Sequence, residues 1–214
     1  MLFRSTKDTT HKIPKDSVIS TTKTKSKKIE TYRTFKIDST GKFALMRLNS
    51  FSKGMLRTFF RRSFRSMKKN NIQNLILDLR INGGGKVSNS TLLTKYLSGQ
   101  SFKIADTVFS KFQTLYPYTN HIRGRFLNNI ELCLIARKKV DGQYHLTRYE
   151  QKIFRPKHRL NYNGKAYVLI NGPTFSASCL FANTVKGQQN ITLIGEEAGG
   201  GWYGNNGIMI PDIT

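Results

Sequence analysis

The pattern of apolar and polar residues changes at about residue 31. Residues 1 to 30 are rich in Lys, Thr and Ser and have little apolar periodicity, so we expect a basic, poorly ordered tail or the remnant of an upstream domain. From residue 31 to residue 214, short apolar runs alternate with segments of helical spacing. A chain of this length can bury one sizeable core, and we treat 31–214 as a single domain.

Four short apolar runs have the length of buried strands. They are Phe43–Leu48, Asn74–Leu79, Ala166–Ile170 and Ile191–Ile194. Three segments that follow them have the character of helices: Leu56–Met67, Val87–Tyr96 and Ala177–Val185. Strands that alternate with helices predict an α/β fold with parallel strands.

Residues 98 to about 162 are less regular and mix aromatic with basic residues. We interpret them as an elaboration on the core, with a strand at Ile130–Ala136 and a turn at Asp141-Gly142. Cys133 lies inside that apolar run, where a small buried side chain is expected rather than a reactive thiol. Cys133 and Cys179 have neither the CxxC spacing nor the spacing of a zinc site.

The net charge of +24 favours a polyanionic partner when it is considered alone. Lys and Arg crowd the first third of the chain, however, and after Lys165 the only basic residue is Lys186. We therefore interpret the basic runs as solvated surface, which makes a nucleic acid an unlikely partner. No apolar stretch approaches the roughly 20 residues of a membrane span, and the N-terminus lacks the apolar core of a signal peptide. The sequence of this chain therefore does not indicate a cellular compartment.

Two turns follow predicted strands, where backbone amides are unpaired and point outward. The first, Asp78–Gly85, ends in three glycines, and the second is Thr174–Ser178. A phosphate-binding GxxxxGK[ST] loop would need glycine at Arg80 and Ser or Thr at Val87, so nucleotide binding is not supported.

Ser176 alone could be a helix N-cap, but the two turns together can do more. Acyl transfer needs a nucleophilic hydroxyl and two backbone donors that face the developing oxyanion. Ser176 and the amide of Ala177 could supply the nucleophile and one donor, and the Gly83–Gly85 loop could supply the other. Because sites in open α/β sheets lie outside the carboxyl ends of the strands, we expect Gly84 and Ser176 to lie close together there.

Three segments resemble the signatures of the C-terminal processing (tail-specific) serine protease family, in the same order and with similar separations. They are Asp78-Leu79-Arg80-Ile81-Asn82-Gly83-Gly84-Gly85, Phe175-Ser176-Ala177-Ser178, and Ile194-Gly195-Glu196-Glu197 with Gly199-Gly200-Gly201. The resemblance implies a ClpP/crotonase-like ββα superhelix core, incomplete at both ends, and a polypeptide substrate. It also implies hydrolysis through an acyl-enzyme on Ser176, with Gly84, Gly85 and Ala177 as the oxyanion hole. It implies no metal or organic cofactor, and work in the bacterial envelope or periplasm.

The general base is where the sequence departs from part of that family. The lysine-dyad branch has Gly-Lys-Gly where this chain has Gly199-Gly200-Gly201. The chain is thus more similar to the tricorn-like branch, whose histidine lies upstream of the core and whose glutamate lies further downstream. We expect a truncated piece with little activity by itself.

The remaining titratable candidates carry no catalytic assignment. We expect the four histidines to have surface or packing roles, since none lies in a recognisable partner pattern. They are His11, His121, His145 and His158. We expect Glu196 and Glu197 to face solvent at a strand end.

Two alternatives stay open. One is a degenerate peptidase that binds peptides but has lost its base. The other is a surface module for polyanions, with a basic stripe on one helix formed by Arg61, Arg62, Arg65, Lys68 and Lys69. An α/β-hydrolase fits less well, because the residues around Ser176 lack the glycines of a GxSxG turn.

Overall fold

The computed structural model describes residues 32–110, 112–114 and 125–200. Its main body is a five-stranded sheet with the strand order β1-β2-β3-β7-β8. The strands are β1 (Arg33–Ile37), β2 (Phe43–Leu48), β3 (Asn74–Asp78), β7 (Lys165–Ile170) and β8 (Ile191–Gly195). Only β1 is antiparallel to its neighbour, and the other pairs are parallel. The α/β prediction is confirmed, whereas β1 was not foreseen.

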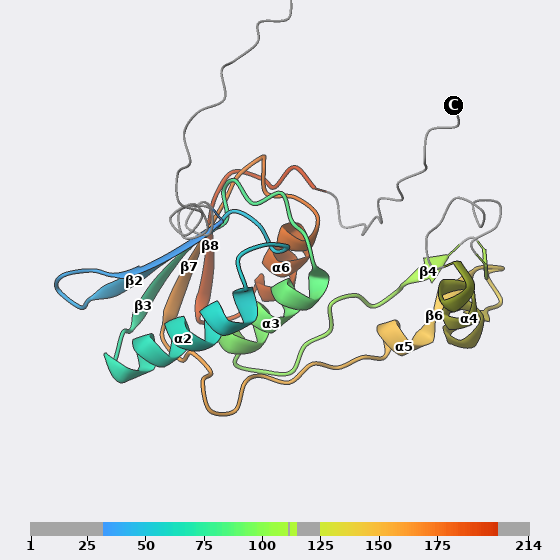
Figure 1. The fold of residues 1–214 in the computed structure, drawn as a ribbon, viewed down its shortest axis with the longest axis horizontal. Coiled ribbons are helices and arrows are strands. Elements are labelled where there is room, and N and C mark those ends of the chain that lie inside the picture. The colour runs from blue at the N-terminus through green and yellow to red at the C-terminus, as the bar shows by residue number, and fades with distance from the viewer. Residues whose placement is uncertain (1–31, 111, 115–124, 201–214) are drawn as a thin grey trace, which may run out of the picture.

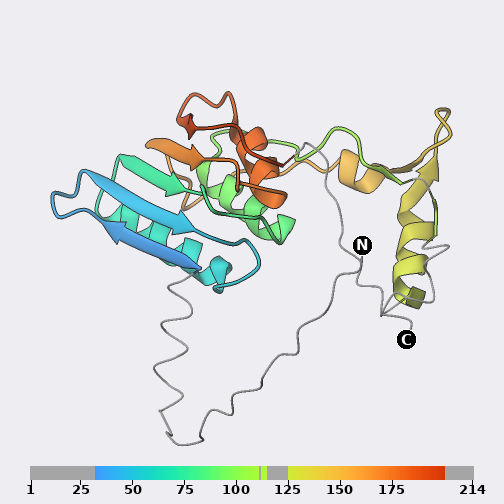
Figure 2. The same ribbon diagram turned by 90° about the horizontal axis from the view of Figure 1, so that it is seen from above.

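Three helices cover one face of this sheet (Figures 1 and 2). They are α2 (Leu56–Lys69), α3 (Val87–Leu97) and α6 (Ala177–Val185). Side chains at alternate strand positions, such as Leu75, Leu77 and Val168, are fully buried against them. Phe64 of α2 stacks on Tyr96 of α3 with 4.5 Å between ring centroids. Each such buried aromatic or aliphatic side chain stabilises the fold by about 1.5–3 kcal/mol, so this core fixes the strand ends that carry the site.

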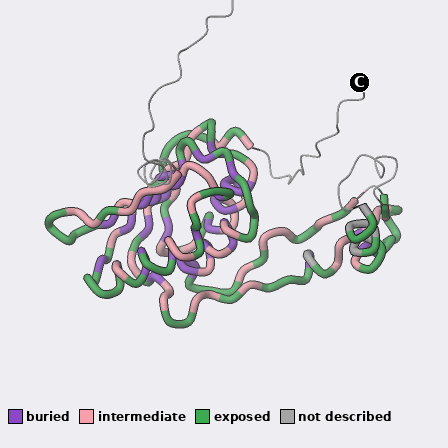
Figure 3. Tube along the Cα trace, in the orientation of Figure 1, coloured by how far each residue is buried: buried purple, intermediate pink, exposed green. Residues whose placement is uncertain are grey.

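The opposite face of the sheet is less covered within the described residues (Figure 3). Ile76 and Tyr167 are neighbours on β3 and β7 and are only half-buried. On β2 and β8, Phe43 is 38% exposed and Ile194 is 45% exposed. The expectation of buried strands therefore holds for the helix-covered face alone.

A small lobe is inserted between α3 and β7 and lies to one side of the main sheet (Figures 1 and 2). It contains a three-stranded sheet and two helices: β4 (Phe109–Ser110), α4 (Arg125–Ile135), β5 (Ala136–Lys138), β6 (Tyr144–Leu146) and α5 (Thr147–Glu150). Two connecting segments join it to the main body, and Phe102 and Phe154 exchange a pair of backbone hydrogen bonds between them.

Two predictions within the lobe are wrong. The expected strand Ile130–Ala136 is the second half of α4, and only Ala136 belongs to a strand. A short apolar run fits a helix as well as a strand, and here the helix begins before the run. Cys133 is exposed on α4 and is not a buried side chain. The turn at Asp141-Gly142 is confirmed, since the Gly142 amide donates to the Lys139 carbonyl at 3.0 Å.

His145 is held in the lobe between two carboxylates. Its Nδ1 lies 2.6 Å from Glu150 Oε1, and its Nε2 lies 2.7 Å from Asp141 Oδ2. The hydrogen bonds with Asp141 and then Glu150 raise the pKa of His145 above its ordinary value. Although burial opposes it, hydrogen bonds from the Val108 amide, Lys139 and His145 lower the pKa of Glu150 to about 2. The imidazolium is therefore the form that links β6 to its turn and to α5.

This arrangement predicts that the local stability of the lobe depends on pH. The raised pKa of His145 gives stability that is complete below about pH 6.5. This stability is lost as the pH rises through the pKa that His145 has in the folded protein. The lowered pKa of Glu150 gives stability above about pH 4.3 that is lost as the pH falls towards about 2. Hydrogen exchange of amides 136–150, corrected for intrinsic rates, should show more protection at about pH 5.5 than at about pH 9.

The His145→Gln variant should remove this difference. His158→Gln is the matched control, because His158 is exposed on the segment before β7. Equal pH dependence in the two variants would contradict the role given to His145.

Candidate active site

The two turns singled out in the sequence lie side by side. Strands β3 and β7 are parallel neighbours in a register that pairs Asp78 with Leu169, so both end at the same edge of the sheet. The glycine loop follows β3 and the turn before α6 follows β7. The expectation that both strands belong to one sheet, with the two turns at their carboxyl ends, is confirmed.

Backbone and side-chain hydrogen bonds join the two turns. The Leu79 amide donates to the Leu169 carbonyl at 2.9 Å. The buried hydroxyl of Thr174 donates to the Leu79 carbonyl at 3.0 Å, and the Phe175 amide donates to the Asn82 carbonyl at 3.1 Å. These contacts hold the residue before Ser176 against the glycine loop.

Gly84 is the point of closest approach between the turns. Its φ of +98° lies in the left-handed region, and a Cβ placed there would stand 2.7 Å from the Phe175 carbonyl oxygen and 2.8 Å from Ser176 Cβ. Only glycine fits such an approach without movement of the backbone. The expected proximity of Gly84 and Ser176 is confirmed.

Ser176 has a strained backbone. Its φ of 51° and ψ of −120° are outside the regions that L-residues ordinarily occupy, at a cost on the order of 1–3 kcal/mol. Although Ser176 occupies the N-cap position of α6, its side chain makes no capping hydrogen bond. It is half-exposed, and Oγ has no hydrogen-bond partner among the described residues. Capping therefore does not account for this serine.

The third glycine segment covers the turn that holds Ser176. The Gly199 amide donates to the Gly172 carbonyl at 2.9 Å. A Cβ on Gly200 would stand 2.7 Å from Cys179 Sγ and 3.0 Å from the Ser176 nitrogen. The three sequence motifs thus meet around one serine.

The backbone amides near Ser176 differ in whether they already donate a hydrogen bond. The Gly84 amide donates to Asn82 Oδ1 at 2.9 Å. Within the described part of the chain, neither the Gly85 amide nor the Ala177 amide donates a hydrogen bond. Ala177 begins α6, where amides are free and the positive end of the helix dipole lies.

Three residues to which the sequence motifs assigned no role of their own support the two turns around Ser176. Asp78 is nearly buried and pairs with Arg47 of β2 and Arg80 of the loop, each at 3.0 Å. Burial opposes ionisation, but these hydrogen bonds lower the pKa of Asp78 below its usual value. Asn82 and Thr174 are completely buried and link the two turns. The sequence could have pointed to these residues only through their positions. Asp78 and Asn82 lie inside the Asp78–Gly85 motif, and Thr174 lies two residues before Ser176.

The described histidines do not face Ser176. His145 lies in the small lobe with both ring nitrogens engaged. His158 is exposed and lines a hollow with Gln73 and Gly164, which precede β3 and β7 at the opposite edge of the sheet. His11 and His121 lie outside the described residues. His158 thus has the surface position expected of it, whereas His145 lies between two carboxylates that no sequence pattern indicated.

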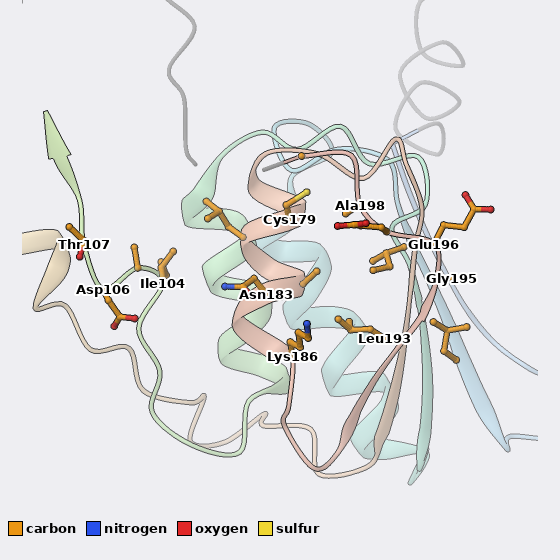
Figure 4. A pocket seen from close by; sticks show the side chains of 17 residues that line it. Ile104, Asp106, Thr107, Cys179, Asn183, Lys186, Leu193, Gly195, Glu196 and Ala198 are labelled. Carbon is orange, nitrogen blue, oxygen red and sulfur yellow. The ribbon is translucent and has the colours of Figure 1, made fainter. Parts of the chain in front are cut away.

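A cavity of about 590 Å³ adjoins the first turn of α6, next to Ser176. Its lining comes from α6, from β8 and the turn after it, and from the connecting segment at 104–107 (Figure 4). Leu180, Leu193 and Ile194 make much of the wall apolar. Glu196 and Glu197 line it as exposed residues, as predicted for a solvent-facing strand end.

Within the ranges that the structure describes, no group of three or more His, Cys, Asp or Glu residues is arranged to hold a metal ion. Over the same ranges, every helix is too short or too polar to cross a bilayer.

Comparisons with known proteins identify the family of this chain. The sequence profile of peptidase family S41 matches residues 42–213. No curated protein sequence matches the chain significantly.

Solved structures share the fold at low sequence identity. A proposed peptidase from Parabacteroides merdae ATCC 43184 superposes with a TM-score of 0.54 and 19% identity, over 83% of this chain and 49% of that one. Mature CPAF in complex with lactacystin superposes with a TM-score of 0.52 and 17% identity, over 78% of this chain and 41% of that one. The chain thus spans less than half the length of these two proteins.

The mixed α/β fold is that of S41 protease structures, with a ClpP/crotonase-like core. Because the family profile covers most of the sequence, the chain belongs to peptidase family S41, a family of serine hydrolases.

Proposed function

We propose that this chain is the core of a serine-type peptidase in which Ser176 is the nucleophile. The observation that carries the proposal is the state of Ser176: a strained, half-exposed serine at a helix N-terminus, pressed against Gly84, with no capping bond. Strain of this kind persists only where the surroundings enforce it, and it concentrates at functional sites.

In the proposed reaction, Ser176 Oγ attacks the carbonyl carbon of a peptide bond as a base removes its proton. The carbonyl oxygen becomes an oxyanion and accepts hydrogen bonds from the amides of Ala177 and Gly85. Gly84, the third residue assigned to the oxyanion hole, would donate its amide only after releasing Asn82 Oδ1. The amine then leaves with a proton, and water hydrolyses the acyl-enzyme to regenerate Ser176.

We propose that the base in this scheme is a histidine other than the two described ones. His145 and His158 contact parts of the chain away from Ser176. The segment Gly199-Gly200-Gly201 lacks the lysine of the Gly-Lys-Gly pattern. This favours the tricorn-like arrangement of Ser, His and Glu over a lysine dyad. A polypeptide in extended form would place a side chain in the cavity beside α6, where the apolar wall suits an aliphatic residue.

A peptide-binding module without catalysis is the second candidate. It is favoured by the positions of the two described histidines, neither of which faces Ser176. The two candidates differ in whether the serine reacts.

Ser176→Ala should abolish hydrolysis of an unfolded polypeptide by the form of the protein that carries the activity. Its thermal melt should change little, because no capping bond is lost, whereas a true cap would cost about 1 kcal/mol. Ser178→Ala is the control: this buried hydroxyl has no partner among the described residues, so its removal should spare both activity and stability. Turnover retained in Ser176→Ala would remove Ser176 from the mechanism.

Gly84→Ala should lower both stability and turnover, because the new methyl group would overlap the Phe175 carbonyl and Ser176. The backbone must shift to relieve this overlap, and a displacement of the reacting group by about 1 Å costs on the order of a hundredfold in rate. Gly83→Ala is the matched control, since a Cβ there meets nothing within 4 Å. Denaturation curves and steady-state rates measure the two effects, and equal behaviour of the two variants would mean that the Gly84 contact does not position Ser176.

A further inference from the structure

Positive charge is concentrated over α2, α3 and the segment 151–164. No Asp or Glu occurs in these three stretches. We call their Lys and Arg side chains the basic face: Arg57, Arg61, Arg62, Arg65, Lys68 and Lys69 of α2, Lys95 of α3, and Lys152, Arg155, Lys157 and Arg159 of the segment. All are exposed except Lys95 and Lys157, which are half-buried.

Contacts between these elements show that the basic face is continuous. Lys68 Nζ donates to the Arg159 carbonyl at 3.0 Å, at the C-terminal end of α2. The Lys157 amide donates to the Lys95 carbonyl at 2.7 Å, next to α3. At the other end of α2, Arg57 lines one hollow together with Lys95 and Lys152. The segment therefore runs along both helices and adds its charges to theirs.

Carboxylates do not neutralise this face. Among the described residues no ion pair joins it to Asp or Glu, and three of its lysines lie over aromatic rings instead. Lys95 and Lys152 each lie 5.2 Å from the centroid of Phe154, and Lys157 lies 5.8 Å from that of Tyr96. Burial and then repulsion from Lys157 and Lys152 lower the pKa of Lys95. An external anion would relieve this repulsion.

The remainder of this chain does not supply that anion. Residues 1–31 contain more Lys and Arg than Asp and Glu, and residues 201–214 contain a single acidic residue, Asp212. These two stretches therefore do not complement the charge of the basic face.

Two features favour a lipid surface over a nucleic acid. Phe154 and Tyr96 are already covered by lysines, so they do not offer free faces for stacking with bases. Exposed aliphatic side chains lie among the cations instead: Ile153 is 62% exposed and Val87 is 40% exposed. Cations interleaved with such side chains suit the interfacial region of a bilayer. The apolar side of α2 is buried in the core through Phe60 and Phe64, so contact would be peripheral.

We propose that the basic face binds the surface of a membrane rich in anionic phospholipid. One phosphate head group would occupy the hollow of about 460 Å³ between Arg57, Lys95 and Lys152, whose wall includes Leu92, Ile104 and Phe154. This binding is separate from the reaction proposed at Ser176, which precedes α6 on the other side of α3 from α2.

The test uses the full chain and sedimentation with vesicles of phosphatidylcholine, with or without phosphatidylglycerol. Binding should require phosphatidylglycerol and should weaken steeply as salt rises above about 0.1 M, where the screening length is about 10 Å. The triple variant Arg61→Gln, Arg65→Gln, Lys152→Gln should bind on the order of a hundredfold more weakly, since each charge near the surface contributes about fivefold.

The matched control removes three exposed lysines away from the basic face: Lys42→Gln, Lys138→Gln and Lys165→Gln. Lys42 lies in the β1–β2 turn, Lys138 in the small lobe and Lys165 at the start of β7. Both triple variants should keep the circular dichroism of the parent. Equal loss in the two variants would mean general charge attraction and overturn the proposal. So would binding to phosphatidylcholine alone, or tighter binding to a short DNA duplex than to the anionic vesicles.

Discussion

The contact between the glycine loop and the turn before α6 is the constraint on which the site depends. Gly84 leaves no room for a side chain against Phe175 and Ser176, and the turns are bonded to each other through Leu79, Asn82 and Thr174. Because these bonds are made within a rigid sheet edge, the strain at Ser176 has a structural support. A serine that is held rather than capped keeps its hydroxyl available for reaction.

The elements around this contact follow from simple chemistry. Parallel strands β3 and β7 bring their carboxyl ends together, and the helices α3 and α6 begin there. The helix start supplies the free Ala177 amide, and the glycines allow the approach of bare backbone. Asp78 secures the end of β3 through two arginines. The sheet and the helices therefore position the two turns, and the turns contain the groups proposed to react.

Regular periodicity made much of the main body predictable from sequence. The bounds of α6 were predicted as observed, and β2 also matches, because both segments have unambiguous apolar patterns. The run at Ile130–Ala136 was assigned to a strand since length and hydrophobicity do not distinguish a short strand from part of a helix. The partners of His145 were missed because Asp141 and Glu150 reach it only through a turn and a short helix. The bonds made by Thr174 and Asn82 depend on strand order, which no local pattern encodes.

Covalent labelling of the folded chain with a fluorophosphonate, followed by peptide mapping, tests the central claim most directly. The free amide of Ala177 and the half-exposed hydroxyl of Ser176 should direct the reagent to Ser176 in the folded chain, even at a reduced rate. The adduct should be absent from Ser178 and should disappear when the chain is unfolded in urea. An adduct spread over several serines, or the same yield at Ser176 in the folded and unfolded chain, would show that the fold does not activate this residue.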